Sequence, residues 1–247
     1  FDEYVPMADP TSALRDVTHL LIAAPPTKNG APAFNMHADD VLKMKNLEWV
    51  GYLSTTGVYG DRNGGEVNEK SELNPTNARG EKRVKAERQW LSLFYHHDIP
   101  VHIFRLSGIY GPGRSALDTI RAGVARRINK PGHKFNRIHV DDIVQTLIAS
   151  FQNPNPGAAY NLADDSPAPS HEVIAYACEL LGIPVPPCIP FDEADLAPMA
   201  MSFYKDNKIV LNNRIKEELG VQLKYPTFQT GLEGCLQAER LAAEQAE

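Results

Sequence analysis

The first half of the chain alternates between short continuous apolar runs and segments with helical spacing. The apolar runs are Val17–Ala24, Leu47–Thr55 and Val101–Leu106, which suit strands buried on both faces of a parallel sheet. Helical spacing occurs in Asn35–Lys45 and Glu81–His96. A strand remnant, a short helix and a polar loop are expected at Asp2–Met7, Pro10–Asp16 and Asp61–Asn77. Strands that alternate with helices in this way predict a doubly wound parallel α/β sheet.

Beyond Pro112 the pattern changes to helices joined by proline-rich connections such as Pro184–Pro190. The helices expected there are Ala116–Arg127, Val140–Phe151, Ser170–Leu181 and Asn212–Leu219. We therefore divide the chain into a sheet-based core at residues 1–112 and a mixed region at residues 113–247. The mixed region is expected to contribute partly to the core and partly to a smaller, intertwined C-terminal α/β lobe.

The composition is that of an ordinary globular protein, with 247 residues of which 43% are hydrophobic and 23% charged. The formal net charge of −6 argues against general affinity for nucleic acid or anionic membranes. No apolar run is long enough to insert into a membrane. The local basic stretch Arg114–Lys134 is either a solvated face or a patch for an anionic substrate.

Cysteine usage bears on the compartment. Cys178, Cys188 and Cys235 are widely spaced and odd in number, which fits neither a disulfide framework nor a metal cluster. Free thiols of this kind are typical of a reducing compartment. We expect a cytoplasmic protein, or one of an organelle matrix if a targeting segment preceded Phe1.

Four segments with a recognisable order carry the candidate chemistry. They are Ser54–Gly60 (S-T-T-G-V-Y-G), Phe104–Gly113 (F-R-L-S-G-I-Y-G-P-G), Arg137–Ile143 (R-I-H-V-D-D-I) and Tyr160–Ala163 (Y-N-L-A). Together they resemble the extended short-chain dehydrogenases/reductases, the family of nucleotide-sugar epimerases and dehydratases, and most closely its atypical bacterial NAD-dependent epimerase/dehydratase-like branch. The resemblance covers about residues 1 to 235. It implies a Rossmann-type fold, with the nucleotide-binding core at residues 1–112 and NAD or NADP as cofactor.

The same resemblance implies where chemistry would take place. Thr55 matches the Ser or Thr that polarises the substrate carbonyl in this family. Arg79 and Arg83 occupy the positions of the catalytic Tyr and Lys, so these three residues are the catalytic candidates. An arginine stays protonated and has no acceptor, so Arg79 cannot act as acid or base, whereas Arg83 can still bond a ribose hydroxyl. The implied cofactor contacts are Ala23, Ala24, Ser54, Thr55, Arg83, Leu106, Ser107, Gly108 and Tyr110.

The two arginines have two open interpretations. Being one helical turn apart, they can clamp a phosphate or carboxylate, or they can pair with Glu and Asp at the surface or in an interface. Lys82 and Lys85 are expected to be solvated on other faces of the same helix.

Other titratable residues have simpler interpretations. Tyr59 and Tyr110 are alternative proton carriers, but packing explains them as well. His139, Asp141 and Asp142 look like a cluster of ligands. Because an acidic pair at the start of a helix serves as its cap and first-turn charge, we predict no metal site there.

The glycine loop that holds the cofactor pyrophosphate in this family has no counterpart in the sequence. The first glycine is Gly30, which follows two expected strands, and Gly108, Gly111 and Gly113 belong to a different turn. Either the sequence is a piece of a longer protein or this protein has dispensed with half of a dinucleotide site. In both cases residues 1–247 should bind NAD(P) very weakly. NAD is not distinguishable from NADP, because the discriminating residue follows a strand that is also absent.

Two functions are compatible with these features. One is an NAD(P)-binding enzyme of epimerase, dehydratase or reductase ancestry that acts on a small molecule, an anionic one if the arginines form a clamp. The other is a catalytically inactive scaffold or an accessory subunit of a larger assembly. The arginine substitutions favour the scaffold, whereas Thr55 and the C-terminal motifs favour the enzyme. A homodimer or an assembly partner is open in either case.

Overall fold

A parallel four-stranded sheet forms the centre of the molecule, in the order β1-β2-β4-β8. The computed structural model describes residues 11–245, so the strand expected at Asp2–Met7 lies outside the described residues. The strands are β1 (His19–Ile22), β2 (Trp49–Thr55), β4 (Val101–Leu106) and β8 (Ala159–Leu162). Thr55 pairs with Leu106, so β2 and β4 end at the same level of the sheet. Side chains that follow these two strands therefore meet at one edge.

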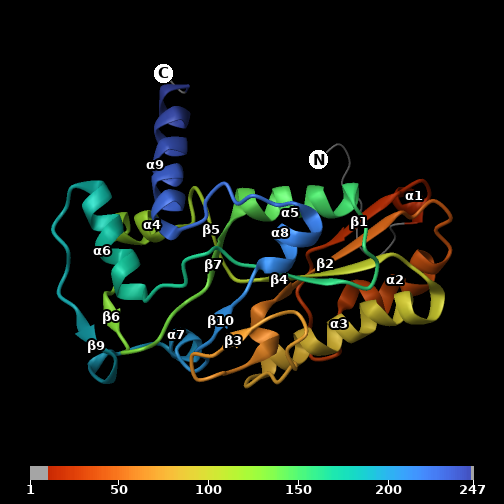
Figure 1. Cartoon of the computed structure of the whole chain (residues 1–247), viewed down its shortest axis with the longest axis horizontal. Coiled ribbons are helices and arrows are strands. Elements are labelled where there is room, and N and C mark those ends of the chain that lie inside the picture. The colour runs from red at the N-terminus through yellow and green to blue at the C-terminus, as the bar shows by residue number, and fades with distance from the viewer. Residues whose placement is uncertain (1–10, 246–247) are drawn as a thin grey trace.

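Helices cover both faces of this sheet (Figure 1). On one face Tyr52 and Ile103 pack with Trp90 of α3 (Ala78–His97) and Val41 of α2 (Pro32–Leu42). On the other face the cluster around Phe104 includes residues of α5 (Val140–Gln152) and α8 (Asn213–Leu219). The doubly covered parallel sheet confirms the predicted α/β fold class, and its central strands β2 and β4 bury apolar side chains on both sides.

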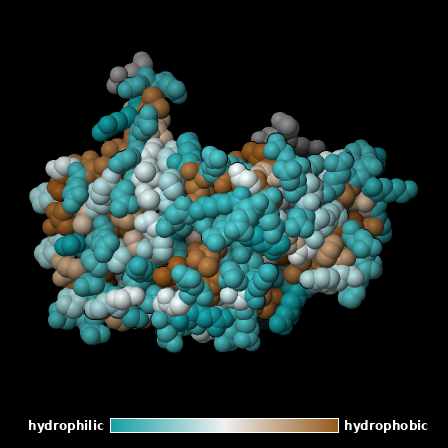
Figure 2. All heavy atoms as spheres, viewed as in Figure 1, coloured by the Kyte–Doolittle hydropathy of each residue, from teal (hydrophilic) through white to brown (hydrophobic). Residues whose placement is uncertain are grey.

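A smaller lobe is built on α4 (Ala116–Arg121), α6 (Ser170–Leu181) and α9 (Phe228–Glu244), which share an apolar cluster with Leu117, Val173 and Leu232. The C-terminal end of α9 projects from this lobe (Figure 1), and most of the surface in the same view carries hydrophilic side chains (Figure 2). Among the described residues no helix is long and apolar enough to cross a membrane.

Short elements connect the lobe to the sheet. Three parallel pairs of short strands join segments that are distant in sequence, namely β10–β3, β5–β7 and β6–β9. Their bounds, with those of the remaining helical turns, are α1 (Thr11–Leu14), η1 (Thr56–Tyr59), β3 (Glu66–Val67), β5 (Gly108–Tyr110), β6 (Ile128–Asn129), β7 (Arg137–His139), β9 (Ile189–Pro190), η2 (Phe191–Glu193), α7 (Pro198–Phe203) and β10 (Ile209–Val210). In the β10–β3 pair, Ile209 lies opposite Glu66. This pair connects the segment after α7 with the loop that follows β2.

The expected elements are largely confirmed, with three corrections. The helix expected at Ala116–Arg127 ends at Arg121, because Gly123 adopts a left-handed φ of 69° that stops it. The segment expected to be only a loop, Asp61–Asn77, contains strand β3. Helices α7 and α9 were not predicted, although Thr227 begins α9 with a capping box to Thr230.

A buried polar network holds the end of β2 in place. Glu87 of α3 accepts hydrogen bonds from Ser54 Oγ at 2.5 Å and from Arg105 Nη2 at 2.9 Å. Arg105 Nη1 also donates to the Tyr59 hydroxyl at 2.9 Å, and that hydroxyl donates to Asn161 Oδ1 at 2.7 Å. These bonds connect strands β2, β4 and β8 with α3, so the residues around Thr55 rest on a rigid frame.

Candidate functional site

A hollow of about 490 Å³ opens at the carboxyl ends of three strands of the sheet. Its floor consists of the residues that follow these strands: Pro25 and Pro26 after β1, Thr55–Gly57 at the end of β2, and Leu106–Gly108 at the end of β4. In parallel α/β sheets ligands bind outside the carboxyl ends of the strands, and small-molecule sites have volumes of about 300–1,000 Å³. The hollow is therefore the candidate functional site.

The first turns of α3 form one wall of the hollow. Asn77 caps this helix, because its side chain accepts hydrogen bonds from the backbone N–H groups of Arg79 and Gly80 at 3.1 and 3.0 Å. This start point directs Arg79, Lys82 and Arg83 toward the hollow. The expectation that Lys82 faces elsewhere is wrong: three residues turn a helix by about 300°, which returns Lys82 to within about 60° of Arg79. Lys85 does not line this hollow.

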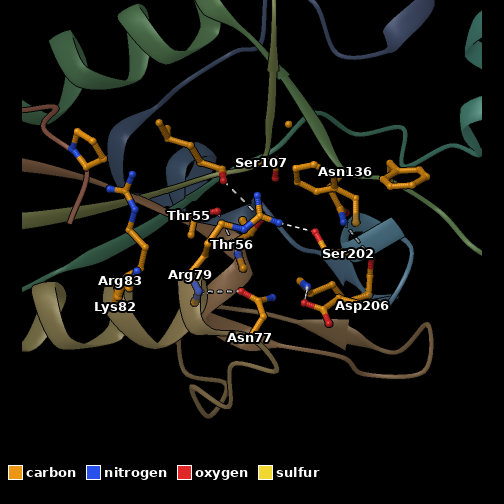
Figure 3. A pocket seen from close by; sticks show the side chains of 18 of the residues that line it. Thr55, Thr56, Asn77, Arg79, Lys82, Arg83, Ser107, Asn136, Ser202 and Asp206 are labelled. Carbon is orange, nitrogen blue, oxygen red and sulfur yellow. Dashed lines mark hydrogen bonds and ion pairs between the residues drawn. The ribbon is translucent and has the colours of Figure 1, made fainter. Parts of the chain in front are cut away.

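The two arginines at the expected catalytic positions make different contacts. Arg83 Nη1 donates to the Leu53 carbonyl at 2.6 Å and to the Tyr52 hydroxyl at 3.2 Å, which holds the side chain against β2. Arg79 extends across the hollow, where its Nη2 donates to Ser202 Oγ at 2.5 Å (Figure 3). Within residues 11–245 neither arginine forms an ion pair with Glu or Asp, so the predicted surface pairing is not observed there.

The opposite wall comes from the C-terminal region. Its lining residues are Lys134, Phe135, Asn136, Ser202, Phe203, Asp206 and Lys208. Lys208 is buried, and its Nζ donates to the Gly60 carbonyl at 2.8 Å and lies 3.7 Å from Asp206 Oδ2. Burial lowers the pKa of Lys208, and nearby Asp206 acts in the opposite direction. Of these residues only Lys134 was named from the sequence, as the end of the basic stretch Arg114–Lys134. No local motif connects the others with Thr55.

Two hydroxyl groups lie at the strand ends. Thr55 Oγ1 accepts a hydrogen bond from the Gly57 backbone N–H at 3.2 Å, which leaves its own proton free to donate into the hollow. Ser107 Oγ is buried and has no hydrogen-bond partner among the described residues, and Ser107 lines the same hollow. A buried hydroxyl without a partner is costly, so this group suits a ligand atom.

The charge of the hollow contrasts with the charge of the chain. Of the residues that the structure describes, five cationic ones line it, namely Arg79, Lys82, Arg83, Lys134 and Lys208, against the single carboxylate of Asp206. The whole chain carries a formal net charge of −6. A concave site lined by one sign of charge focuses its field and attracts the opposite charge. The hollow is therefore suited to an anionic ligand.

Some of the predicted site residues lie outside the hollow. Ala23 and Ala24 follow β1, but it is Pro25 and Pro26 that line the hollow. Ser54 is directed to the other side of β2, where it bonds Glu87. These positions follow from the alternation of side chains along a strand and its extension.

Tyr110 lies in a second cavity of about 500 Å³ in the lobe. Its ring packs edge-on against His139, and burial raises the pKa of its hydroxyl far above the ordinary value. His139 itself caps α5, because its Nδ1 accepts from the Asp141 backbone N–H at 3.1 Å, while Asp141 and Asp142 lie in the first turn. Among the described residues no group of His, Cys, Asp and Glu is suited to hold a metal ion.

A parallel sheet covered by helices on both faces, with a ligand-sized hollow at its carboxyl edge, defines an α/β protein of the Rossmann type. The model of the NAD dependent epimerase/dehydratase family matches residues 36–163, which is more than half of the chain. The chain belongs to this family.

Known relatives are consistent with this assignment. The protein YeeZ of Escherichia coli K12 is 27% identical over 237 residues, which cover 91% of this chain and 77% of YeeZ. A solved structure of a functionally unknown conserved protein from Silicibacter pomeroyi is 54% identical with a TM-score of 0.86, covering 90% of this chain and 78% of that one. The dTDP-glucose 4,6-dehydratase of Bacillus anthracis, solved in complex with NAD, shares the fold with a TM-score of 0.72 at 19% identity, covering 92% of this chain and 74% of that one.

Proposed function

We propose that this protein is an NAD(P)-binding enzyme that acts on a small anionic molecule in the hollow at the ends of β2 and β4. The observation that carries the proposal is that Thr55, Arg79, Lys82 and Arg83 line one hollow in which, among residues 11–245, Asp206 supplies the one carboxylate. The relatives with NAD in their solved structures support the choice of cofactor. The excess of positive charge supports the choice of an anionic substrate.

The residues of the hollow fit the nicotinamide and ribose end of a dinucleotide. Arg83 uses only Nη1 for bonds to the protein, so its Nε and Nη2 have no partner among residues 11–245 and can donate to ribose hydroxyls. Ser107 Oγ offers a further buried donor and acceptor. A nicotinamide held there would supply the acceptance or donation of a hydride.

In this proposal the side chains polarise and orient the substrate. The Thr55 hydroxyl donates a hydrogen bond to the oxygen of the reacting carbonyl, because its oxygen accepts from the Gly57 N–H and its proton remains available to a ligand. Arg79 and Lys82 bind the acidic group of the substrate and fix its orientation. The guanidinium groups stabilise negative charge that develops on oxygen, but they do not transfer protons.

Proton transfer is assigned to Lys208. It lines the hollow from the segment just before β10, and burial brings its pKa closer to the physiological range than that of a solvated lysine. Its contacts with the Gly60 carbonyl and Asp206 hold the amine at the wall of the hollow. The protein would then use a lysine next to β10 as its proton carrier, in place of a tyrosine on α3.

A catalytically inactive scaffold remains the second candidate, and one observation favours it. Arg79 is engaged with Ser202 and with the ring of Phe203, 4.8 Å from its guanidinium carbon, so the position of the usual acid/base serves here to connect α3 with α7. Such a protein would bind ligand without turning it over.

Binding and turnover measured side by side distinguish the two candidates. NADH and NADPH are titrated by calorimetry, and carbonyl compounds with and without a carboxylate or phosphate are then assayed for oxidation of the cofactor. The enzyme proposal expects weak cofactor binding by residues 1–247 that Arg83→Ala weakens further, and turnover of acidic substrates that Thr55→Val lowers by about 10²-fold. Arg88→Ala, on the same helix but outside the hollow, is the matched control. Cofactor binding without any turnover would favour the scaffold, and turnover unaffected by Thr55→Val would refute the assignment of the site.

A further inference from the structure

Helix α7 (Pro198–Phe203) lies at the hollow between two anchored ends, and none of its residues is buried. Before it, Arg126 donates to the carbonyl of Asp195. After it, the Tyr204 carbonyl accepts from Lys130 Nζ at 2.5 Å, and the Tyr204 ring is buried against Phe135. The helix is therefore a short segment that is fixed at both ends but buries no side chain between them. Segments of this kind have the lowest local unfolding free energy in a fold.

One residue connects α7 with the wall on the other side of the hollow. Arg79 Nη2 donates to Ser202 Oγ (Figure 3). The Arg79 guanidinium also lies over the Phe203 ring, 4.8 Å from its centroid. In the part of the chain that the structure describes, no other side-chain hydrogen bond or ring contact joins α7 to a different element. Met199 is 68% exposed and Phe203 55%, so apolar burial contributes little to holding the helix.

The partners of Arg79 are weak compared with an anion. A serine hydroxyl and a phenyl ring are uncharged, whereas a carboxylate or phosphate forms shorter, charge-assisted and often bidentate bonds with a guanidinium. Lys82 lines the hollow beside Arg79, so an anion there meets a second positive charge. An acidic ligand can thus replace both contacts of Arg79 with α7, and the exchange lowers the free energy because the new bonds are charge-assisted.

We propose that Arg79 is a positioning residue that holds α7 over the hollow and exchanges this contact for the acidic group of the ligand, so that α7 is a lid released by anion binding. This inference rests on the proposed function only for the identity of the ligand as an anion. The contact between Arg79 and the lid exists without a ligand and can be tested separately.

The first experiment measures hydrogen exchange of the α7 backbone amides by mass spectrometry without any ligand. Arg79→Ala should increase exchange in residues 198–204 about three- to tenfold, the effect of losing one hydrogen bond of ordinary net strength, because the bond to Ser202 is exposed to water. Arg88→Ala, on the exposed side of α3 away from the hollow, should leave it unchanged. Equal exchange in wild type and Arg79→Ala would overturn the lid proposal whatever the protein binds.

The second experiment adds inorganic phosphate, with sodium chloride at equal ionic strength as reference. Phosphate should increase α7 exchange in the wild type but not in Arg79→Ala, where the lid is already released. If phosphate slows hydrogen exchange in α7, the claim that Arg79 leaves α7 for the anion is refuted. Such a result would mean that the anion bridges α7 and Arg79. If phosphate binds the wild type and Arg79→Ala equally, the anionic site of the proposed function fails, while the result without ligand still decides whether Arg79 holds the lid.

Variants of the α7 residues test whether Ser202 and Phe203 compete with the anion for Arg79 or only support the structure. Ser202→Ala and Phe203→Ala remove the competing partners of Arg79, so phosphate affinity should rise about two- to fivefold in each. Arg79→Lys keeps a positive charge but not the planar contact with Phe203, so it should retain phosphate binding and lose protection of α7. A loss of phosphate affinity in Ser202→Ala would contradict the proposal, since it would make the hydroxyl a part of the anion site.

Discussion

The buried ion pair between Glu87 and Arg105 offers the sharpest test of how the site is supported. The Glu87 side chain is 1% exposed and that of Arg105 6%, with Arg105 Nη2 2.9 Å from Glu87 Oε2. Desolvation lowers the pKa of Arg105, but the Glu87 carboxylate beside it outweighs this effect and raises the pKa overall. Arg105 therefore stays charged in the interior, and its charge depends on the neighbouring carboxylate.

Changing either partner alone to methionine leaves an unpaired charge in the interior. Removal of one member of a buried pair costs about 3–5 kcal/mol. For a chain of this size 1 kcal/mol corresponds to about 2–4 °C, so each single variant should melt about 6–20 °C lower. Each variant also loses a second buried hydrogen bond: Glu87→Met removes the acceptor of the Ser54 hydroxyl, and Arg105→Met removes the donor to the Tyr59 hydroxyl.

The double variant Glu87→Met with Arg105→Met removes both charges and should recover most of the loss, because buried pairs replaced by apolar groups are often neutral. Guanidinium unfolding followed by circular dichroism gives the four free energies of the cycle. Losses that simply add in the double variant would refute the reasoning, since independent effects carry no coupling energy. Losses below about 1 kcal/mol in both single variants would show that water reaches the pair.

Three further predictions concern the pKa shifts and the close packing near the site. Burial raises the pKa of Asp164 to about 7, with Arg137 acting in the opposite direction. The folded state therefore retains a proton that the unfolded state loses, and stability falls as pH rises from about 4 to 7. Asp164→Asn should raise the melting temperature at pH 8 more than at pH 5, whereas an equal effect at both values would contradict the raised pKa. Lys208→Arg keeps the charge but cannot release a proton, so it should preserve phosphate affinity and lower turnover by about 10²–10⁴-fold; full activity would exclude Lys208 as proton carrier. A Cβ at Gly80 would lie 2.6 Å from Pro75 Cβ, so Gly80→Ala should shift the start of α3 and cost about 1–3 kcal/mol in guanidinium unfolding, and an unchanged midpoint would contradict this.

The sequence by itself determined the elements of the core. Strand β4 and helix α6 have the bounds predicted from their patterns, because an apolar run or a helical repeat depends on neighbouring residues. The motif around Thr55 and the positions of Arg79 and Arg83 also led to residues that line the hollow. Helix α9 was not predicted because Gly231 and Gly234 lower its helical propensity. It forms because Phe228 and Leu232 pack in the apolar cluster that it shares with α4 and α6.

Only the tertiary structure decided the second wall of the hollow and the partners of the arginines. Ser202 meets Arg79 across 123 positions of sequence, and Lys208 reaches Gly60 across 148. No local periodicity encodes such contacts, because they depend on how the segment from α7 to β10 packs against the ends of the sheet strands. The same holds for Ser54 and Thr55, neighbours in one motif: the pleat of β2 directs one side chain to Glu87 and the other to the hollow.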